Sequence, residues 1–386
     1  MSRIKKINVY NVGFGDCCLC ENEEALMLVD CGTKRNNAFF IDTINKLDAK
    51  FTKDDNKEKY MVLTHLHEDH YNGIKNLNPS IVFDKIYLPN YISTMSLKIL
   101  GAALIESSSN RIIKQVINIL KIPQLFSKRI NGRTIIYLLS EKDCFINRLG
   151  NFDILLPLKT DIFVDVNTKK EIESFANIED QFYIQHEEVL LDFAVRYREI
   201  LRYNEIENTL TISEDIDKID ELIYELFKYR RQNNNAKSSF YIDKIYKRLH
   251  NRLSLAFQDK YDDTTKHLLF WGDAERSRIH KVIKSGRLHE SYEFIKVQHH
   301  GTKSYFTNKL PVSNYYSISN GLINYHWDID ERYDDFYSSN VNSKIICTNS
   351  SNCMKRIKGV NCVLRTRVGS YCDLNGIIRN PIDVTI

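Results

Sequence analysis

The sequence predicts a mixed α/β protein in which a helical insertion separates two β-rich parts. The first observation is that an apolar run at residues 61–63 leads directly into a histidine-rich stretch at residues 65–70, as at a strand end followed by a loop and a helix. The second is that short β-type runs occur early in the chain and resume late. The third is that the intervening residues carry many tyrosines and charges and show no clear β run. We therefore expect a first β-rich part at residues 1–160, an insertion at 161–250 and a second β-rich part at 251–386.

The elements of the first part follow from hydrophobic periodicity, because alternating or continuous apolar runs indicate strands and apolar residues three and four apart indicate helices. Cys17, Cys18 and Cys20 lie in an alternating apolar stretch, and no second cysteine pair has matching ligand spacing, so we expect buried strand thiols rather than a metal site. Further strands are expected at residues 7–12, 25–29, 60–63, 81–89, 134–139 and 152–156, with helices at 37–47 and within 93–122.

The insertion contains two amphipathic helical segments. Ser213 is expected to cap a helix whose apolar positions recur at helical spacing over residues 216–227. A second helix is expected at residues 242–249. We expect the insertion to pack on the rest of the chain or to form the surface of a homodimer or of a partner-protein complex. The alternative is direct contact with an anionic ligand, along a path lined by Arg230, Arg231 and Lys237.

The β pattern resumes in the second part, and two of its expected strands end in acidic or histidine residues that could bind metal. An apolar run stops at Gly272 and Asp273, where a helix is expected to begin, and another run ends in His299 and His300. Gly301 allows the backbone to turn sharply after these histidines. Strands are expected at residues 254–258, 267–271, 295–298, 315–319, 344–348 and 360–365.

The histidine-rich stretch is the strongest chemical signal in the chain. Residues two apart on an extended segment point the same way, so His65 and His67 can converge on one cation. Asp69 and His70 then turn onto the following helix and can face a second cation. Imidazole nitrogen with carboxylate oxygen is the ligand set of zinc, manganese or iron rather than of calcium. We therefore expect a pair of divalent metal ions, either zinc or manganese.

Other polar residues at strand ends are candidates for the same site. Asp30 ends an apolar strand before a glycine, which fits either a turn residue or a group that orients a ligand imidazole. Asp273 stands where a ligand bridging two metals would lie. Of the adjacent His299 and His300, one is expected to bind metal and the other to face substrate. His326 is a candidate for the mouth of the site.

Composition limits the class of protein. The formal net charge of +4 permits an anionic substrate without requiring one. Nine cysteines without regular spacing argue against the disulfide framework of a secreted protein, and no signal peptide is evident. No run approaches the roughly 20 apolar residues that span a bilayer. We therefore expect a cytoplasmic protein with no membrane partner.

The His-x-His-x-Asp-His string at residues 65–70 resembles the signature of the metallo-β-lactamase superfamily. The stretches Val-Gly-Phe-Gly-Asp at residues 12–16 and Leu-Val-Asp-Cys-Gly at 28–32 resemble those that open that fold. The resemblance implies a four-layer αββα metallo-β-lactamase sandwich, interrupted here by the helical insertion. It also implies two metal ions, the first bound by His65 and His67, the second by Asp69, His70 and His300, with Asp273 bridging them.

The superfamily's usual third histidine of the first site has no clear counterpart, and His250 and His267 are candidates by position only. One branch lacks it as well. Residues 251–255, 271–275, 296–304 and 318–320 resemble the soluble metallo-β-lactamase domain of the competence proteins involved in DNA internalisation. That branch implies phosphodiester hydrolysis, although the membrane-spanning competence domain is missing from this sequence.

The functional hypothesis is a metal-dependent hydrolase, a phosphodiesterase or nuclease that uses a metal-bound hydroxide at a dinuclear site on nucleic acid or another phosphodiester. Asp69 and Asp273 would position the nucleophile, and His299, Lys303 or His326 would contact the phosphate or protonate the leaving oxygen. The expected supporting or substrate-contacting residues are Asp16, Asp30, Asn251, Lys303, Ser304 and His326.

Three alternatives remain open at the level of sequence. The same centre would also suit a carbon ester, thioester or lactam, or a small phosphodiester in place of a polymer. A metal-stabilised binding or regulatory module is the alternative from another class. A basic cluster near the end of the chain would suit a nucleic-acid backbone or a solvated face equally well; it comprises Lys355, Arg356, Lys358, Arg365 and Arg367.

Overall fold

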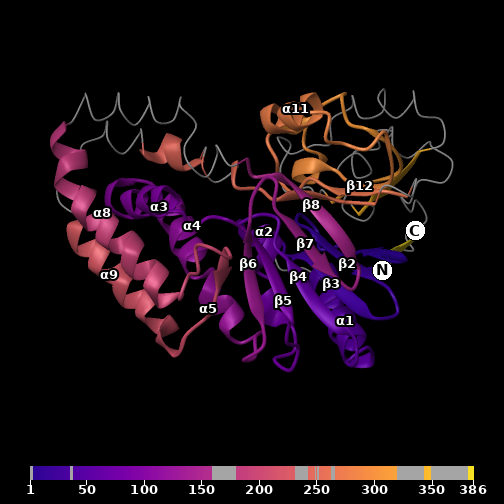
Figure 1. Ribbon diagram of the computed structural model, residues 1–386, viewed down its shortest axis with the longest axis horizontal. Coiled ribbons are helices and arrows are strands. Elements are labelled where there is room, and N and C mark those ends of the chain that lie inside the picture. Colours follow the sequence, from indigo (N-terminus) through magenta and orange to yellow (C-terminus); the bar gives the residue numbers. More distant parts are fainter. Residues whose placement is uncertain are drawn as a thin grey trace.

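Two β-sheets packed face to face form the centre of the molecule, and helices cover their outer faces (Figure 1). The structure is a computed structural model. It describes residues 3–34, 38–158, 180–230, 242–247, 249, 252–261, 266–319, 343–348 and 381–386. The side chains of residues 180–185 and 303 are outside this description.

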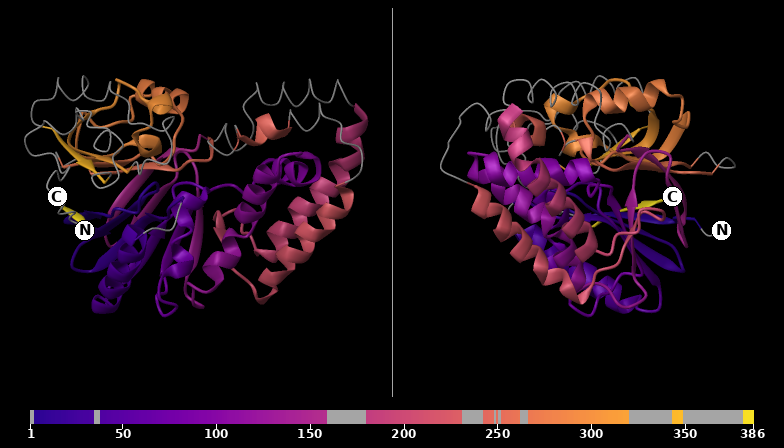
Figure 2. Two further views of the ribbon diagram at one scale, coloured as in Figure 1. Left: turned by 180° about the vertical axis from the view of Figure 1, so that it is seen from behind. Right: turned by 60° about the vertical axis from the view of Figure 1, so that its left-hand side comes forward.

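The first sheet has eight strands in the order β15-β1-β2-β3-β4-β5-β6-β9. Strands β3 to β6 run parallel to one another, whereas β1 pairs antiparallel with both β2 and β15. The strand bounds are β1 Lys6–Val9, β2 Cys17–Glu21, β3 Ala25–Cys31, β4 Glu58–Val62, β5 Lys85–Pro89, β6 Ile135–Leu139, β9 Thr209–Leu210 and β15 Ile382–Thr385. Because β15 pairs with β1, the two ends of the chain lie close together (Figure 2).

The second sheet has seven strands in the order β14-β13-β12-β11-β10-β8-β7. Strands β11 to β14 are parallel, and the other pairs are antiparallel. The bounds are β7 Cys144–Asn147, β8 Gly150–Leu156, β10 Ala256–Asp259, β11 Leu268–Phe270, β12 Ser291–Lys296, β13 Val312–Ile318 and β14 Lys344–Cys347.

Helices lie on both outer faces of this pair of sheets. The α-helices with both ends described are α1 Ala38–Lys53, α2 Glu68–Tyr71, α3 Thr94–Glu106, α4 Asn110–Leu120, α5 Ile122–Ser127, α8 Asp180–Ile200, α9 Lys218–Tyr229 and α11 Arg276–Lys284. Residues 242–247 and 249 are also helical, where the second helix of the insertion was expected. Short 3₁₀ turns are η1 Ile74–Asn76, η2 Glu214–Asp217, η3 Gln298–Gly301 and η4 Lys303–Tyr305.

The alternation of side chains along the strands explains the layers. In β3, Met27 packs into the apolar core between the two sheets, whereas Leu28 packs into the core beneath the helices of the first sheet. In β11, Phe270 belongs to the core between the sheets, and Leu269 faces the outer core beside α11. Because successive side chains of a strand point to opposite faces, each sheet contributes to two cores. The predicted four-layer αββα fold is confirmed.

Helices α8 and α9 lie beside α3 at the end of the molecule away from the termini (Figures 1 and 2). Leu190 and Phe193 of α8 pack closely over Gly101 of α3, and the hydroxyl of Tyr197 donates a hydrogen bond to the carbonyl of Leu120 over 2.9 Å. Ser213 caps a shorter element than expected: its hydroxyl accepts the amide of Asp215 in the 3₁₀ turn η2, whereas α9 begins at Lys218 and has no side-chain cap at Asp217. The boundaries at residues 160 and 250 stay predictions.

Several elements differ from the expected ones. The strand expected at residues 81–89 begins at Lys85, because the residues before it bond outside the sheet: the amide of Ile81 donates to the carbonyl of Asn78, and that of Phe83 to the carbonyl of Arg129. Helix α8 was not expected, nor were β7 and β15. The two-residue strand β9, too short to show alternation, extends the first sheet from within the predicted insertion. The strand expected at residues 360–365 lies outside the described residues.

The carboxyl ends of β3, β4, β11 and β12 meet at one edge of the sandwich, where the loops between layers approach closely. A Cβ atom on Gly32 would lie 2.5 Å from the backbone carbon of Asp69, and one on Gly272 would lie 2.7 Å from the Ser254 hydroxyl. Gly272 also has a positive φ of 52°, a conformation that glycine adopts without steric cost. Glycine at these two positions therefore lets segments far apart in the sequence meet.

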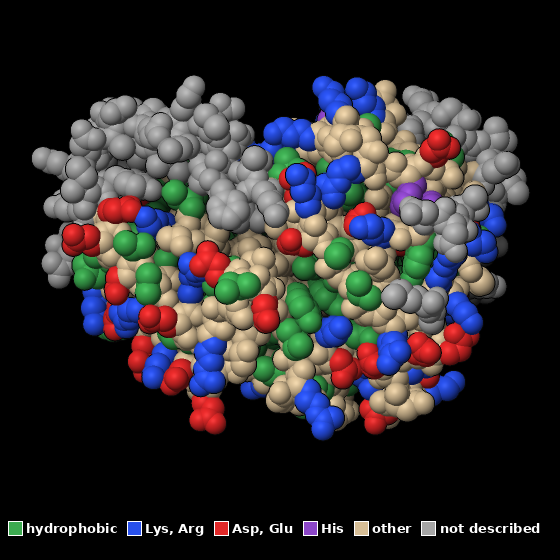
Figure 3. All heavy atoms as spheres, in the orientation of Figure 1, with side chains coloured by type: hydrophobic (Ala, Val, Ile, Leu, Met, Phe, Trp, Pro, Cys, Tyr) green, Lys and Arg blue, Asp and Glu red, His purple; other side chains and the backbone are tan. Residues whose placement is uncertain are grey.

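The surface of the described residues has no large field of one sign on the face seen in Figure 3. Acidic and basic side chains are mixed along its lower edge, whereas Lys and Arg gather at its upper edge over α11. In the part of the chain that the structure describes, no helix combines the length and the apolar character needed to cross a membrane.

Candidate metal centre

The histidine loop follows β4 and enters α2, as the sequence predicts. His65 is buried and His67 half-buried, and Nε2 of His65 lies 2.6 Å from Nδ1 of His67. One carboxylate oxygen of Asp273, from the loop after β11, lies with these two nitrogens in a group whose members are all within 4.8 Å of one another. Two imidazole nitrogens and one carboxylate oxygen are donor types that bind zinc, so these three residues form one candidate ion position.

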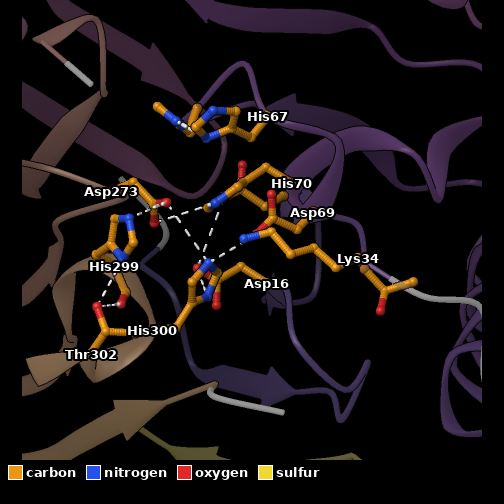
Figure 4. Close-up of polar contacts among 12 residues, drawn as sticks. Asp16, Lys34, His67, Asp69, His70, Asp273, His299, His300 and Thr302 are labelled. Carbon is orange, nitrogen blue, oxygen red and sulfur yellow. Dashed lines mark hydrogen bonds and ion pairs between the residues drawn. The ribbon is translucent and has the colours of Figure 1, made fainter. Parts of the chain in front are cut away.

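A second group shares Asp273 with the first. Ligand atoms of Asp16, His70, Asp273 and His300 lie within 4.8 Å of one another, and all four residues are buried. Nε2 of His70 is 3.3 Å from Oδ1 of Asp273, and Nε2 of His300 is 3.8 Å from Oδ2 of the same residue. Figure 4 shows these side chains converging from both halves of the sandwich. Asp273 therefore stands between two candidate metal positions.

Asp69 lies at the border of the second group. One of its carboxylate oxygens is 3.3 Å from Nε2 of His300 and 3.4 Å from the ammonium of Lys34 (Figure 4). The sequence did not point to Lys34, which has no motif around it. Its ammonium also lies 4.1 Å from the centroid of the Phe14 ring.

Asp30 orients the ligand candidate His70 rather than forming an isolated turn. Its carboxylate accepts the amide of Thr64 over 2.7 Å and lies 2.9 Å from Nδ1 of His70, which leaves Nε2 of that ring facing Asp273. Asp30 itself has a positive φ of 55°. A carboxylate behind the imidazole fixes the tautomer and increases the basicity of the ligand nitrogen.

Asp16 is held by a buried lysine. The ammonium of Lys296, at the end of β12, lies 2.7 Å from Oδ1 of Asp16, and Oδ2 of Asp16 lies 3.5 Å from Nδ1 of His300. The sequence identified Asp16 as a supporting residue, but nothing near it pointed to Lys296. The pair joins the opening loop of the first sheet to the second sheet directly beneath the metal group.

His299 lies at the side of the centre, with its ring stacked on that of Tyr305 at a centroid distance of 3.7 Å. The hydroxyl of Thr302 donates to the carbonyl of His299, so Nδ1 of His299 is the donor in its 2.9 Å contact with that hydroxyl. In this tautomer the neutral ring has an acceptor nitrogen, Nε2, which lies 3.7 Å from Asp273. Residues 299–301 all have positive φ, and this turn sends the two imidazoles in different directions.

Charges at the centre shift the pKa values of its ionisable groups. Burial alone would lower the pKa of His300, but the carboxylates of Asp273 and Asp16 outweigh it and raise the pKa to about 9. The pKa of His70 is likewise raised by Asp273 and Asp30 against the effect of burial. Burial lowers the pKa of His299 to about 4. Because a metal binds neutral imidazole, ions entering this centre displace the protons on His70 and His300.

The donor set fits divalent metal ions. Nε2 of His70, Oδ1 of Asp273 and Nε2 of His300 are buried, and none has a hydrogen-bond partner among the described residues. Buried polar atoms in proteins are normally satisfied, and imidazole nitrogens with carboxylate oxygens at these separations match zinc or manganese. The structure therefore brings together the six predicted ligands: His65 and His67 lie on one side of Asp273, and His70 and His300, with Asp69 beside His300, lie on the other.

The remaining predicted residues are placed less centrally or fall outside the description. Ser304 is exposed in η4, and His267 lies in a separate group with Asp259 and His289, where its ring stacks on His289 at 3.5 Å. That group shares no residue with either of the two groups around Asp273, so His267 is not the third histidine of the first site. The following lie outside the described residues or side chains: Asn251, His250, Lys303, His326 and the basic cluster at residues 355–367.

Replacing Asp30 by asparagine is expected to weaken zinc or manganese binding by about 10- to 100-fold, the usual effect of losing a carboxylate behind a metal-bound histidine. The amide keeps the contact with Thr64 but no longer provides a negative charge beside Nδ1 of His70. Calorimetric titration of the metal-free chain measures this effect. The matched control is Asp42→Asn, which removes an acid from the half-buried surface pair with Lys46; equal affinities in both variants would contradict the role given to Asp30.

Comparison with known proteins agrees with this geometry over part of the chain. The family model described as the metallo-beta-lactamase superfamily matches residues 10–102, the segment that contains Asp16, Asp30 and the histidine loop. None of the curated proteins compared matches the chain.

Two solved structures are similar to the chain at low identity. A protein of unknown function from Enterococcus faecalis V583 is 12% identical with a TM-score of 0.33, and the match covers 92% of this chain and 64% of that one. This chain thus spans less than two thirds of the length of that protein. A B3 metallo-beta-lactamase described as the first with an active-site glutamic acid is 9% identical with a TM-score of 0.29, covering 78% of this chain and 79% of that one.

Proposed function

We propose that the protein is a metal-dependent hydrolase with a dinuclear centre. The observation that carries the proposal is that His65 and His67 on one side, and His70 and His300 on the other, face a common carboxylate, Asp273. The match of residues 10–102 to the metallo-beta-lactamase superfamily supports the same chemistry. Two zinc or manganese ions would lower the pKa of a bound water towards neutrality and neutralise charge that develops on the substrate.

The residues of the chain have separate tasks in this proposal. Asp273, whose amide donates to the Ser254 hydroxyl over 2.7 Å, is held at the point where both metal groups meet. Asp69 is kept beside His300 and Lys34. His299, through its acceptor nitrogen Nε2, accepts a hydrogen bond from the attacking water and orients it towards the substrate. The stack on Tyr305 keeps that ring in place.

For the substrate we propose a phosphodiester, and hence a phosphodiesterase or nuclease. Support comes from the resemblance of residues 251–255, 271–275, 296–304 and 318–320 to the soluble domain of the DNA-internalisation competence proteins. The Lys34 ammonium beside Asp69 adds a cation where a substrate phosphate would enter. The same metal centre would also suit the hydrolysis of carbon esters, thioesters and lactams. These compounds are therefore the negative controls of the test.

The test is a hydrolysis panel with added zinc or manganese. We expect turnover of bis-p-nitrophenyl phosphate and of single- or double-stranded oligonucleotides, abolished by a chelator and by the double substitution His67→Ala, Asp69→Ala. Little or no turnover is expected for p-nitrophenyl acetate, a thioester or a β-lactam. Turnover of one of these carbon substrates with no phosphodiester hydrolysis would overturn the phosphodiesterase proposal and leave the metal-dependent hydrolase. An absence of metal-dependent turnover across the panel would contradict the hydrolase itself.

A further inference from the structure

A groove of about 490 Å³ opens beside the histidine loop, between α2 and the helices α4 and α5. Four lysines line it, one before α1, one in η1 and two at or beyond α4: Lys34, Lys75, Lys114 and Lys121. The acidic group among its lining residues is Glu68, at the start of α2. The groove is therefore basic although the face in Figure 3 has mixed charge.

The lysines of the groove are only partly neutralised. Glu68 accepts a hydrogen bond from the side-chain amide of Asn118 over 2.6 Å, which directs its carboxylate towards α4. Lys121 pairs with Asp220 of α9. Among the described residues, the ammonium groups of Lys75 and Lys114 form no ion pair, and both side chains are exposed. The groove thus offers positive charge that the described residues do not compensate.

The groove is continuous with the candidate metal centre through Lys34. This ammonium lies 3.4 Å from Asp69, whose carboxylate is 3.3 Å from Nε2 of His300. Glu68 and Tyr71 of the groove lie in α2 on either side of Asp69 and His70. A molecule whose reacting group sits at the metal centre therefore extends past Lys34 into the groove.

We propose that this groove binds the sugar-phosphate backbone of a nucleic-acid strand whose scissile phosphodiester lies at the metal centre. Lys114 and Lys121 are seven residues apart along α4 and its end, which corresponds to about 10.5 Å along a helix axis. Cations spread over this length, with Lys34 at the near end, contact phosphates other than the one being cleaved. The inference rests on the proposed phosphodiesterase activity and deepens it: the substrate is a polymer rather than a small diester.

The test is binding of a fluorescent phosphorothioate single-stranded oligonucleotide, which resists hydrolysis, to the metal-loaded full chain. Lys75→Gln, Lys114→Gln is expected to weaken binding by about tenfold at moderate salt, and to reduce the slope of log K against log salt by about 1.4, or roughly 0.7 for each lost phosphate contact. The matched control is Lys281→Gln, Lys284→Gln, which removes the same charge from the exposed face of α11. The control is expected to bind like the unaltered chain.

A second readout separates this inference from the proposed function. Hydrolysis of bis-p-nitrophenyl phosphate is expected to be unchanged in the groove variant, since neither lysine touches the reacting atoms, whereas its KM for an oligonucleotide rises. If the small diester is hydrolysed and the groove variant binds the oligonucleotide as the unaltered chain does, the inference is overturned and the phosphodiesterase stands. An equal loss in the groove variant and the α11 control also overturns it, because net charge alone would explain the effect.

The reverse result is informative as well. If no diester is hydrolysed, but the groove variant alone loses affinity for the oligonucleotide and part of its salt dependence, binding of nucleic acid in the groove is supported and the hydrolase proposal fails. Thermal unfolding of both double variants checks that each is folded, since all four substituted side chains are exposed.

Discussion

Replacing Asp273 by alanine is expected to reduce metal-dependent hydrolysis by roughly 10³-fold or more, and to lower the affinity of both metal positions together. The reason is that one carboxylate serves both groups, with His65 and His67 on one side and His70 and His300 on the other. Removing a histidine from one side takes a ligand from one ion only. Removing Asp273 takes a ligand from both and leaves buried imidazoles facing an empty space.

Metal content after dialysis, measured by atomic emission alongside the rate with bis-p-nitrophenyl phosphate, checks this prediction. His65→Ala is the informative comparison, because it is expected to weaken one ion while the other is retained. Asp55→Ala, at an acid whose side chain is 88% exposed, is the surface control. Retention of two tightly bound ions by Asp273→Ala would contradict the shared position of this residue.

Replacing Lys296 by methionine is expected to destabilise the metal-free chain by about 3–5 kcal/mol, the usual cost of removing one partner of a buried ion pair. Lys296 and Asp16 are both buried, and the ammonium lies 2.7 Å from the carboxylate. Without the ammonium, Asp16 keeps its charge in the interior beside the rings of His70 and His300. Urea denaturation at neutral pH measures the change in the free energy of unfolding.

A double-mutant cycle tests whether the buried charge of Asp16 causes the destabilisation in Lys296→Met. Adding Asp16→Asn to Lys296→Met removes the buried carboxylate that has lost its ammonium partner, so the double variant is expected to recover much of the loss. An additive loss in the double variant would show that packing, rather than the buried charge, explains the effect. The recovered stability does not imply recovered activity, because Asp16 belongs to the second metal group.

The pH dependence of stability has a definite sign at this pair. Burial alone would raise the pKa of Asp16, but the charges of Lys296 and His300 lower it below its ordinary value. Attraction to Asp16 likewise raises the pKa of Lys296 against the effect of burial. The stabilisation is therefore fully present above the unfolded pKa of Asp, about 3.9, and below that of Lys, about 10.4. It is lost on acidification through the folded pKa of Asp16, or at alkaline pH through that of Lys296.

The spacing within residues 65–70 was enough to predict a metal site, because ligand direction in a strand and the first turn of a helix is a local property. The strand ends at Asp30, Asp273 and His300 were visible for the same reason. Lys296 and Lys34 were not identified, since their importance comes from contacts with Asp16 and Asp69, which are distant in sequence. A buried lysine at a strand end has no sequence pattern of its own.

The elements of the fold could be predicted from the sequence where a strand or helix buries its apolar residues in a regular pattern. The continuous apolar runs of β3 and β4 were readable, but the pairing of β15 with β1 joins the two ends of the chain and has no local signal. Helix α8 did have a signal that the surrounding charges obscured: its buried residues recur at helical spacing at Leu190, Phe193, Ala194 and Tyr197. Strand β9 has only two residues, which is below the length at which alternation can be recognised.

The central claim is that separated segments form two adjoining metal positions around Asp273. A crystal structure of the chain grown with manganese or zinc, with anomalous data collected at the absorption edge of that metal, tests it most directly. We predict two anomalous peaks, one among His65, His67 and Asp273 and the other among His70, Asp273 and His300. A structure with no peak at these ligands, or with its metal bound only at Asp259, His267 and His289, would contradict the account.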